Sequence, residues 1–504
     1  MGLNLIIEKL RLLQIITLLI LFSINARAEI QIEKFSAESL PTGFHAITAE
    51  NGFIIVTFPE EKNKWKSHCY SPDGTAKWET DLQIVENEYV IQDELYHGVL
   101  NVFSTLKDEK NKTTSLFLRK IDEKTGEFLS KTELWTRNIK EEHFNNDKAD
   151  VIADENTALV ALRNEDVEVH LEYRFNMALS LREEKMLFYH FDYSDPQLKL
   201  HYKIFDQHVK ELDSGEINLN DGDFIYQVSV NDLGDIFIAN SNLTGDMEVY
   251  RFPFKSEEFN LLNITAGNSV RDDLTMTFTD DNKLYIAAKS EIDERFHGAL
   301  YAFMNFESLE IERVHFQPLS DELKDEVDSL HRAGVIPHIV WTKYNLTHMR
   351  VFNDHELFLV YEHMEVRHSG HIFREIDFVS RLPWKEHKSK VSVGPALFFS
   401  FDSWDNKRWS KYFELERRSD ESVFPLSSAL FVQEPDGDEI TLIISETEKS
   451  YTYTMDYIYD RKEQKDEIQE SGKIIPSWTV KMDGKYYASY YSDLNKSLII
   501  KEIK

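Results

Sequence analysis

The sequence predicts an all-β protein. Helical periodicity is almost absent after residue 28, and short runs of Tyr, Phe, Ile, Val and Thr alternate with clusters of Asp, Asn, Lys and Gly about every 8 to 15 residues. Hydrophobic residues make up 42% of the chain, which is enough to build a core and excludes a disordered protein. With only 18 Gly and 12 Pro among 504 residues, Asn and Asp must form many of the turns.

A hairpin pattern recurs along the chain. It consists of an apolar or aromatic strand, a turn that holds Asp or Asn with Gly or Lys, and a second strand that often holds Trp or Leu. Residues 68–78 and 116–127 show it most clearly, and looser copies begin at Leu187, Val249, Leu300, Leu397 and Met455. Seven copies at intervals of roughly 50 to 70 residues, with one gap near 100, indicate a repeat architecture.

A second recurrent element is a strand entered from an Asp/Asn turn, at residues 231–239, 281–288 and 353–360. Together the two elements make four-stranded units, and units at this period fit the blades of a β-propeller. We therefore predict a single propeller domain over 29–504 with seven blades, six to eight being allowed. Residues 497–500 are expected to pair with an N-terminal strand and close the ring. A tandem of β-sandwiches is the alternative.

The two clearest hairpins carry a family resemblance. The segments SPDGTAKW (71–78) and KIDEKTGEFL (120–129) resemble blade strands of the quinoprotein-like (PQQ-like) propellers and of exported bacterial propeller proteins of unknown function. The resemblance implies the fold. It does not extend to quinone binding, because the adjacent cysteine pair and the calcium-binding carboxylates of that family have no counterpart in this chain.

The first 28 residues are typical of a secretory signal peptide. Lys9 and Arg11 are positive, an apolar segment follows over residues 12–22, and Ala26-Arg27-Ala28 is a small-x-small cleavage site. The apolar segment is shorter than the ~20 residues that a membrane anchor needs. We expect cleavage before Glu29, export to the periplasm, the cell surface or the medium, and no membrane span in the mature protein.

Net charge and cysteine content indicate which partners are excluded and what kind of exported protein this is. The formal net charge is −32, and an anionic surface repels phosphate backbones, so we expect no nucleic-acid partner. Cys69 is the single cysteine and cannot form an intramolecular disulfide. A eukaryotic secreted protein of this size would usually carry several disulfides, and a bacterial exported protein therefore fits best.

One stretch departs from the repeat. Residues 319–330 have apolar side chains at helical spacing, and Ser320 is a candidate N-cap, which predicts a short helix. The helix lies within the widest gap between hairpin copies. We interpret residues 313–350 as a helical and histidine-rich insertion on a face of the propeller.

Histidines are the most suggestive chemical feature. His363, His368 and His371 fall within nine residues, with Glu362, Glu365 and Asp377 nearby. Imidazole suits zinc, copper or iron, so these three histidines are candidate metal ligands. Their spacing matches no established metal motif, and exposed loop histidines are the alternative interpretation.

Other chemistry is less specific. The acidic turns 221–223, 280–282 and 436–439 offer oxygen ligands to calcium, but none continues as a twelve-residue calcium loop. Motifs of metalloproteases, α/β-hydrolases and nucleotide-binding enzymes do not occur. The 89 acidic residues contain no pair that spacing alone identifies as glycosidase carboxylates.

These observations favour a non-enzymatic binding or structural module without a resident cofactor, whose partner is a protein or a glycan. The alternative is a carbohydrate-active hydrolase or lyase with dispersed carboxylates in the propeller funnel. A metal-binding protein that uses calcium or a transition metal is a third hypothesis.

Overall fold

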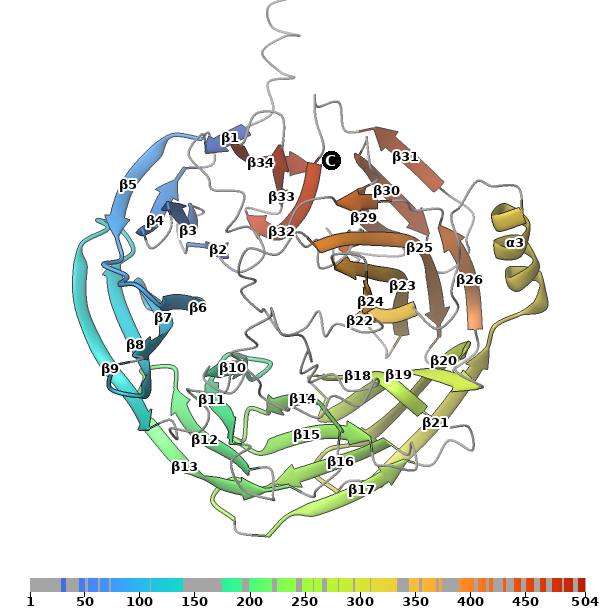
Figure 1. Ribbon diagram of the computed structural model, residues 1–504, viewed down its shortest axis with the longest axis horizontal. Helices are drawn as coiled ribbons and strands as arrows, with labels where there is room; N and C mark the ends of the chain where they lie inside the picture. The colour runs from blue at the N-terminus through green and yellow to red at the C-terminus, as the bar shows by residue number, and fades with distance from the viewer. Residues whose placement is uncertain are drawn as a thin grey trace, which may run out of the picture.

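The computed structural model describes residues 29–503 with gaps, the longest of which are 139–174, 374–388, 33–44 and 333–343, and describes side chains only between residues 47 and 410. Within the described residues, eight antiparallel sheets surround a common axis, and the protein is a β-propeller (Figure 1). The all-β prediction is confirmed. No helix of the described part is long and apolar enough to cross a bilayer.

We number the blades in chain order. Blade one consists of β2 (His45–Thr48), β3 (Ile54–Glu61), β4 (Lys64–Tyr70) and β5 (Ala76–Asp81), and blade two of β6 (Glu88–Tyr96), β7 (Val99–Asp108), β8 (Thr113–Asp122) and β9 (Phe128–Asn138). Blade three consists of β10 (Asn176–Leu179), β11 (Lys185–Asp192), β12 (Lys199–Asp206) and β13 (Glu211–Asn218), and blade four of β14 (Phe224–Val230), β15 (Ile236–Ser241), β16 (Met247–Phe252) and β17 (Asn260–Ile264).

Blade five consists of β18 (Val270–Phe278), β19 (Lys283–Ile292), β20 (Arg295–Asn305) and β21 (Glu310–Pro318), and blade six of β22 (Tyr344–Phe352), β23 (Glu356–His368), β25 (Ser389–Phe401) and β26 (Lys407–Phe413), with the short β24 (His371–Phe373) and β27 (Arg417–Ser419) added. Blade seven consists of β28 (Ala429–Phe431), β29 (Glu439–Ser445), β30 (Ser450–Asp456) and β31 (Glu463–Glu467). Blade eight consists of β32 (Ile474–Met482), β33 (Lys485–Ser492), β34 (Ser497–Ile503) and β1 (Glu29–Ile32).

The ring has two distinct faces. In each blade the first and third strands run in the same direction, so the turns after them lie at one end of the blade. We call this end the turn face. The opposite end carries the connections from one blade to the next, and we call it the connection face. The first strands of neighbouring blades contact one another near the axis, and the fourth strands form the rim (Figure 1).

Strands from the two ends of the chain close the ring. The outermost strand of blade eight is β1, which pairs antiparallel with β34 from Glu29↔Lys501 to Ile32↔Leu498. This confirms the expected pairing of residues 497–500 with an N-terminal strand. The strand begins at Glu29, directly after the predicted cleavage site.

The eight sheets are one more than the seven hairpin copies, at the upper end of the allowed range. Six of the seven copies begin on the third strand of their blade, as β4–β5 and β8–β9 show for the copies at 68–78 and 116–127. The copy at Leu187 begins instead in β11, the second strand of blade three. Blade eight has no hairpin between its third and fourth strands, because its fourth strand comes from the other end of the chain. A count of hairpins therefore misses the closing blade.

Both faces of a blade are apolar and pack against its neighbours. In β15, Ile236 and Ile238 belong to the core between blades three and four, whereas Phe237 and Ala239 belong to the core between blades four and five. Alternation of side chains along a strand explains this division. Each blade therefore needs a neighbour on both sides.

Polar side chains also join neighbouring blades. The indole nitrogen of Trp78 in blade one donates a hydrogen bond to the carbonyl oxygen of Glu123 in blade two (2.7 Å). Between blades six and five, the hydroxyl of Tyr361 donates to the carbonyl oxygen of Ala288 (2.9 Å).

A side-chain amide joins the inner strands of blades four and five. The Oε1 atom of Gln227 accepts a hydrogen bond from the backbone nitrogen of Met276 (2.7 Å), and its Nε2 atom donates to the Met276 carbonyl oxygen (3.1 Å). The amide of Gln227 thus continues the backbone ladder of the next blade.

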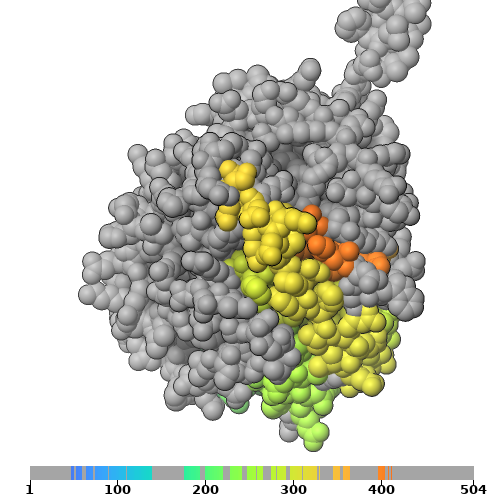
Figure 2. All heavy atoms as spheres, turned by 90° about the vertical axis from the view of Figure 1, so that its right-hand side faces the viewer, coloured from blue at the N-terminus to red at the C-terminus, as the bar shows by residue number. Residues whose placement is uncertain are grey.

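The predicted helix is present as α3 (Asp321–Arg332). Ser320 caps it, since its hydroxyl accepts a hydrogen bond from the backbone nitrogen of Leu323 (3.2 Å). Leu319 and Leu323 are buried in the core between blades five and six. The helix contacts β26 at the outer rim rather than lying on an end face as the sequence suggested (Figures 1 and 2). The two ends of the expected insertion 313–350 belong to β21 and β22.

Deletion of residues 29–32 should destabilise the whole ring, because β34 would lose its partner. At about 1 kcal/mol for each lost backbone hydrogen bond, we expect a loss of about 2 to 4 kcal/mol in the free energy of unfolding. The exposed edge of β34 should also promote association. Chemical unfolding and size-exclusion chromatography measure both effects. A control that replaces residues 29–32 with Thr-Val-Thr-Val should retain stability, and equal loss in both variants would contradict the closing role.

Candidate functional site

The structure places the three predicted metal-binding histidines in blade six. His363 in β23 is buried, with its ring 5.6 Å from the ring of its cross-strand partner Tyr344. His368 and His371 are register partners in the β23–β24 pair, but their side chains lie outside the described residues. The metal site remains a prediction. Within the described residues, no group of three or more His, Cys, Asp or Glu side chains is placed to hold a metal ion.

Two of the three acidic turns, 221–223 and 436–438, lie outside the described residues. The described part of the third is an ordinary hairpin turn. Thr279 donates to Oδ1 of Asp281 (2.6 Å), and Asn282, at a φ of 66°, donates to Oε1 of Glu307 (3.1 Å). These contacts use the polar atoms of the turn within the protein.

Cys69 has the surroundings of an unreactive thiol. Its side chain is fully buried in the core between blades one and two. Burial, together with the negative charge of Glu123, raises the pKa of the thiol to about 12. The thiol is therefore protonated at neutral pH and is not a nucleophile.

An apolar strip is the most distinctive exposed feature of the described surface. Its members are large apolar side chains, 42 to 54% exposed, in blades three and four: Leu181, Leu233, Phe259 and Leu261. Leu181 and Leu233 lie on turns between first and second strands, and Phe259 precedes the outer strand β17. Leu181, Leu233 and Phe259 therefore lie at the turn face, with Leu261 on the adjoining rim.

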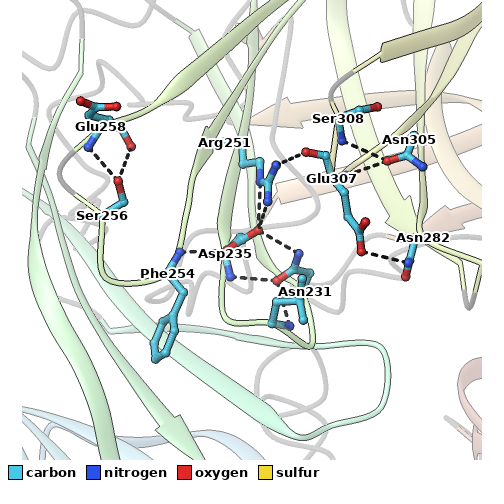
Figure 3. Close-up of polar contacts among 11 residues, drawn as sticks. Asn231, Asp235, Arg251, Phe254, Ser256, Glu258, Asn282, Asn305, Glu307 and Ser308 are labelled. Atoms are coloured by element: carbon cyan, nitrogen blue, oxygen red, sulfur yellow. Dashed lines mark hydrogen bonds and ion pairs between the residues drawn. The ribbon is translucent and has the colours of Figure 1, made fainter.

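A buried polar network fixes the turn that carries Leu233 (Figure 3). Oδ1 of Asn231 accepts hydrogen bonds from the backbone nitrogens of Leu233 (3.1 Å) and Asp235 (2.8 Å). The carboxylate of Asp235 is bound by Nη2 (2.7 Å) and Nε (2.9 Å) of Arg251. Because Arg251 also donates to the carbonyl oxygen of Glu307 in blade five, the network joins two blades.

The same carboxylate holds the neighbouring turn of blade four. Oδ1 of Asp235 accepts a hydrogen bond from the backbone nitrogen of Phe254 (2.8 Å). The ring of Phe254 points away from the polar network and covers Gly234, where a Cβ atom would lie 2.8 Å from the ring (Figure 3). Gly234 also has a φ of 95°, so a side chain at this position would be strained as well as obstructed. Phe254 is partly buried and packs against the core between blades three and four, beneath the turn that carries Leu233.

The turns of blades three and four are joined directly. The backbone nitrogen of Arg182 donates to Oδ1 of Asp232 (3.1 Å), and the two side chains form an ion pair of 3.9 Å. Leu181 directly precedes Arg182, and Leu233 directly follows Asp232, so the two leucines lie on turns that are bonded to each other. On the other side of the strip, the ring of Phe259 lies 5.5 Å from that of Phe252 and 5.6 Å from that of Tyr250.

The border of the strip carries more acid than base. Glu183, Glu184 and Glu258 are exposed, whereas Arg182 is paired with Asp232. The amine of Lys255 lies over the ring of Phe254, 4.9 Å from its centre. A partner with basic side chains around an apolar centre would complement this surface.

A second polar cluster lies toward the connection face, between blades two and three. Arg137 of β9 donates from Nη1 to Nδ1 of His190 (2.9 Å) and pairs through Nη2 with Asp192 (3.3 Å). His201 stacks on His190 at 5.2 Å between ring centres and lies 3.5 Å from Glu216. Sequence reasoning missed this cluster, because Arg137 and His190 lie 53 positions apart in different blades.

Burial governs the charges of this cluster. Desolvation, followed by the neighbouring charge of Arg137, lowers the pKa of His190 to about 3. The same two causes lower the pKa of His201. The two imidazoles are therefore neutral at pH 7, and the cationic charge of the cluster comes from Arg137 and Lys199.

Comparisons with known proteins assign no family to the chain. No family model and no curated protein matches the chain. Matching solved structures include the WD40 domain of SCAP from fission yeast, with 8% identity over 92% of this chain and 95% of that one and a TM-score of 0.43. Dihydro-heme d1 dehydrogenase NirN in complex with DHE matches with 9% identity over 95% of this chain and 77% of that one, at a TM-score of 0.44. Likenesses of this size carry no argument about activity.

Replacement of Asp235 with Ala should destabilise the protein by about 2 to 4 kcal/mol, because it leaves a largely buried guanidinium and a backbone N–H without their acceptor. Urea unfolding measures the change. The matched control is Arg182→Ala, which breaks a 3.9 Å ion pair whose arginine side chain is 60% exposed, and which should change stability by about 0.5 kcal/mol or less. Similar losses in the two variants would mean that the Asp235 network does not hold the turn face.

Proposed function

We propose that the protein is an exported bacterial binding scaffold that captures a partner protein through the apolar strip on the turns of blades three and four. The observation that carries the proposal is the exposure of Leu181, Leu233 and Phe259 on connected turns. The Asn231 and Asp235 side chains hold the turns of blade four, and the hydrogen bond from Arg182 to Asp232 joins the turn of Leu181 to them. A surface that is already ordered loses little conformational entropy when it binds. Exposed apolar patches of this kind are typical of interaction sites.

The charge around the strip specifies the partner's chemistry. The chain carries −32 overall, and the exposed acidic residues beside the strip in the described part of the chain are Glu183, Glu184 and Glu258. We infer that the partner contributes a segment with apolar and basic side chains together. Apolar contact supplies the affinity, and the acidic border selects against acidic segments.

A labelled amphipathic peptide of leucine and lysine is the probe, with a leucine and glutamate peptide for comparison. We expect the basic peptide to bind, and Leu181→Ser with Leu233→Ser to weaken binding about ten- to thirty-fold, since each leucine contributes about 1 kcal/mol on burial. Fluorescence anisotropy gives the dissociation constants.

The control is the double variant Leu129→Ser with Val314→Ser, which removes exposed apolar side chains elsewhere (48% and 39% exposed) and should leave binding unchanged. Equal affinities for the two double variants would mean that the acidic protein attracts the peptide by charge alone. Release of reducing ends from a panel of glycans would contradict a non-enzymatic role. For export, N-terminal sequencing of the secreted protein should give Glu29 as the first residue.

A further inference from the structure

His190 joins blades two and three through a hydrogen bond that depends on its protonation state. A guanidinium can only donate, so the 2.9 Å contact between Nη1 of Arg137 and Nδ1 of His190 is a hydrogen bond when Nδ1 is unprotonated. The same Nδ1 lies 3.0 Å from the carbonyl oxygen of Phe191. If Nδ1 were protonated, it would donate to Phe191, and Arg137 would face an N–H group and a positive charge.

The surroundings of His190 give it little access to water. Its side chain is packed by the rings of Trp135 (5.6 Å) and Phe175 (5.5 Å) and stacked on His201. The charged and titratable groups around it in the described residues come from four strands: Arg137 of β9, Asp192 of β11, Lys199, His201 and Lys203 of β12, and Glu216 of β13.

Most of these charges are already paired. Lys199 binds Glu216 (3.0 Å), Lys203 binds Glu211 (2.7 Å), and Asp192 pairs with Arg137 (3.3 Å). A proton on His190 would therefore gain little from the carboxylates, whereas it would stand directly against Arg137. Nε2 of His190 is buried and has no hydrogen-bond partner among the described residues.

We propose that Arg137 and His190 form an acid-sensitive latch, which holds blades two and three together at neutral pH and loosens them on the connection-face side when His190 is protonated. The low pKa of His190 determines whether acid weakens or strengthens the latch. Because that pKa is about 3 in the closed state and 6.5 for a solvated histidine, the open state binds the proton more readily between these values. The latch should therefore weaken as the pH falls below 6.5.

Four other described contacts between blades lack this sensitivity. Trp78, Gln227 and Tyr361 bind backbone groups of a neighbouring blade, and Arg251 binds a backbone carbonyl oxygen of blade five. None of these contacts uses an imidazole as an acceptor. Acid should therefore act on the boundary between blades two and three before it acts on those other boundaries.

Hydrogen exchange of the whole mature protein, read by mass spectrometry between pH 7.5 and 5, tests the latch. After correction for the intrinsic pH dependence of exchange, opening at β9 and β11 should increase by up to about tenfold for each pH unit below 6.5. Opening at β19 and β20 serves as the internal reference and should not change. A parallel pH dependence in both pairs of strands would overturn the proposal.

Three variants separate the latch from simple packing. His190→Gln keeps an acceptor for Arg137 and should remove the pH dependence while β9 and β11 stay protected. Arg137→Met should open the boundary at pH 7.5 and leave it insensitive to acid. His297→Gln, in β20 of blade five, where the ring stacks on Phe316 of the same blade, should behave like the wild type at β9 and β11. Retention of the full pH dependence by His190→Gln would show that another group is responsible. None of these measurements uses a ligand, so their outcome is independent of the proposed partner.

Discussion

Blades two to five each bury apolar side chains on both faces, and the rest of the structure depends on covering such faces. An open row of blades would leave a core surface exposed at each end, so the chain must form a closed ring. The closing strand is β1, whose four residues pair with β34 at the other end of the sequence. Stability of the whole ring is thereby tied to a short segment that lies at least 466 positions from its partner in the chain, the separation of Ile32 and Leu498.

Some buried polar side chains hold strands in register with one another, which apolar packing alone would not do. The clearest case is blade two, in which the side chains of Glu88 and Arg119 are both fully buried and 2.6 Å apart. Ser104 donates to the same carboxylate (2.6 Å), and Arg119 also binds the carbonyl oxygen of Gln83 in the connection from blade one (3.3 Å). A buried pair of this kind costs desolvation, and its additional hydrogen bonds are what make it tolerable. It fixes the register of three strands and the entry of the chain into the blade.

The sequence predicts features whose residues are close together in the chain, and it does not predict contacts between distant residues. The hairpins at 68–78 and 116–127 were visible because a turn and its two strands are contiguous, and the α3 cap at Ser320 was visible for the same reason. The eighth blade was hidden, since its strands come from both ends of the chain. The exposure of Leu233 could not be inferred either, because it depends on Arg251 and Phe254, which belong to another turn. Nothing in the spacing of His190 and Arg137 indicated that they meet.

The two faces of the ring differ in how their polar contacts should respond to pH. At the turn face, the amide of Asn231 and the carboxylate of Asp235 accept hydrogen bonds without any histidine, and these bonds hold the turn that carries Leu233. Toward the connection face, Arg137 relies on a neutral imidazole, whose charge changes within the range of a histidine. A scaffold built in this way can present an unchanging binding surface while one boundary of its ring responds to acid. The separation is possible because blades contact only their neighbours, so a change at one boundary need not spread to the turns that hold the apolar strip.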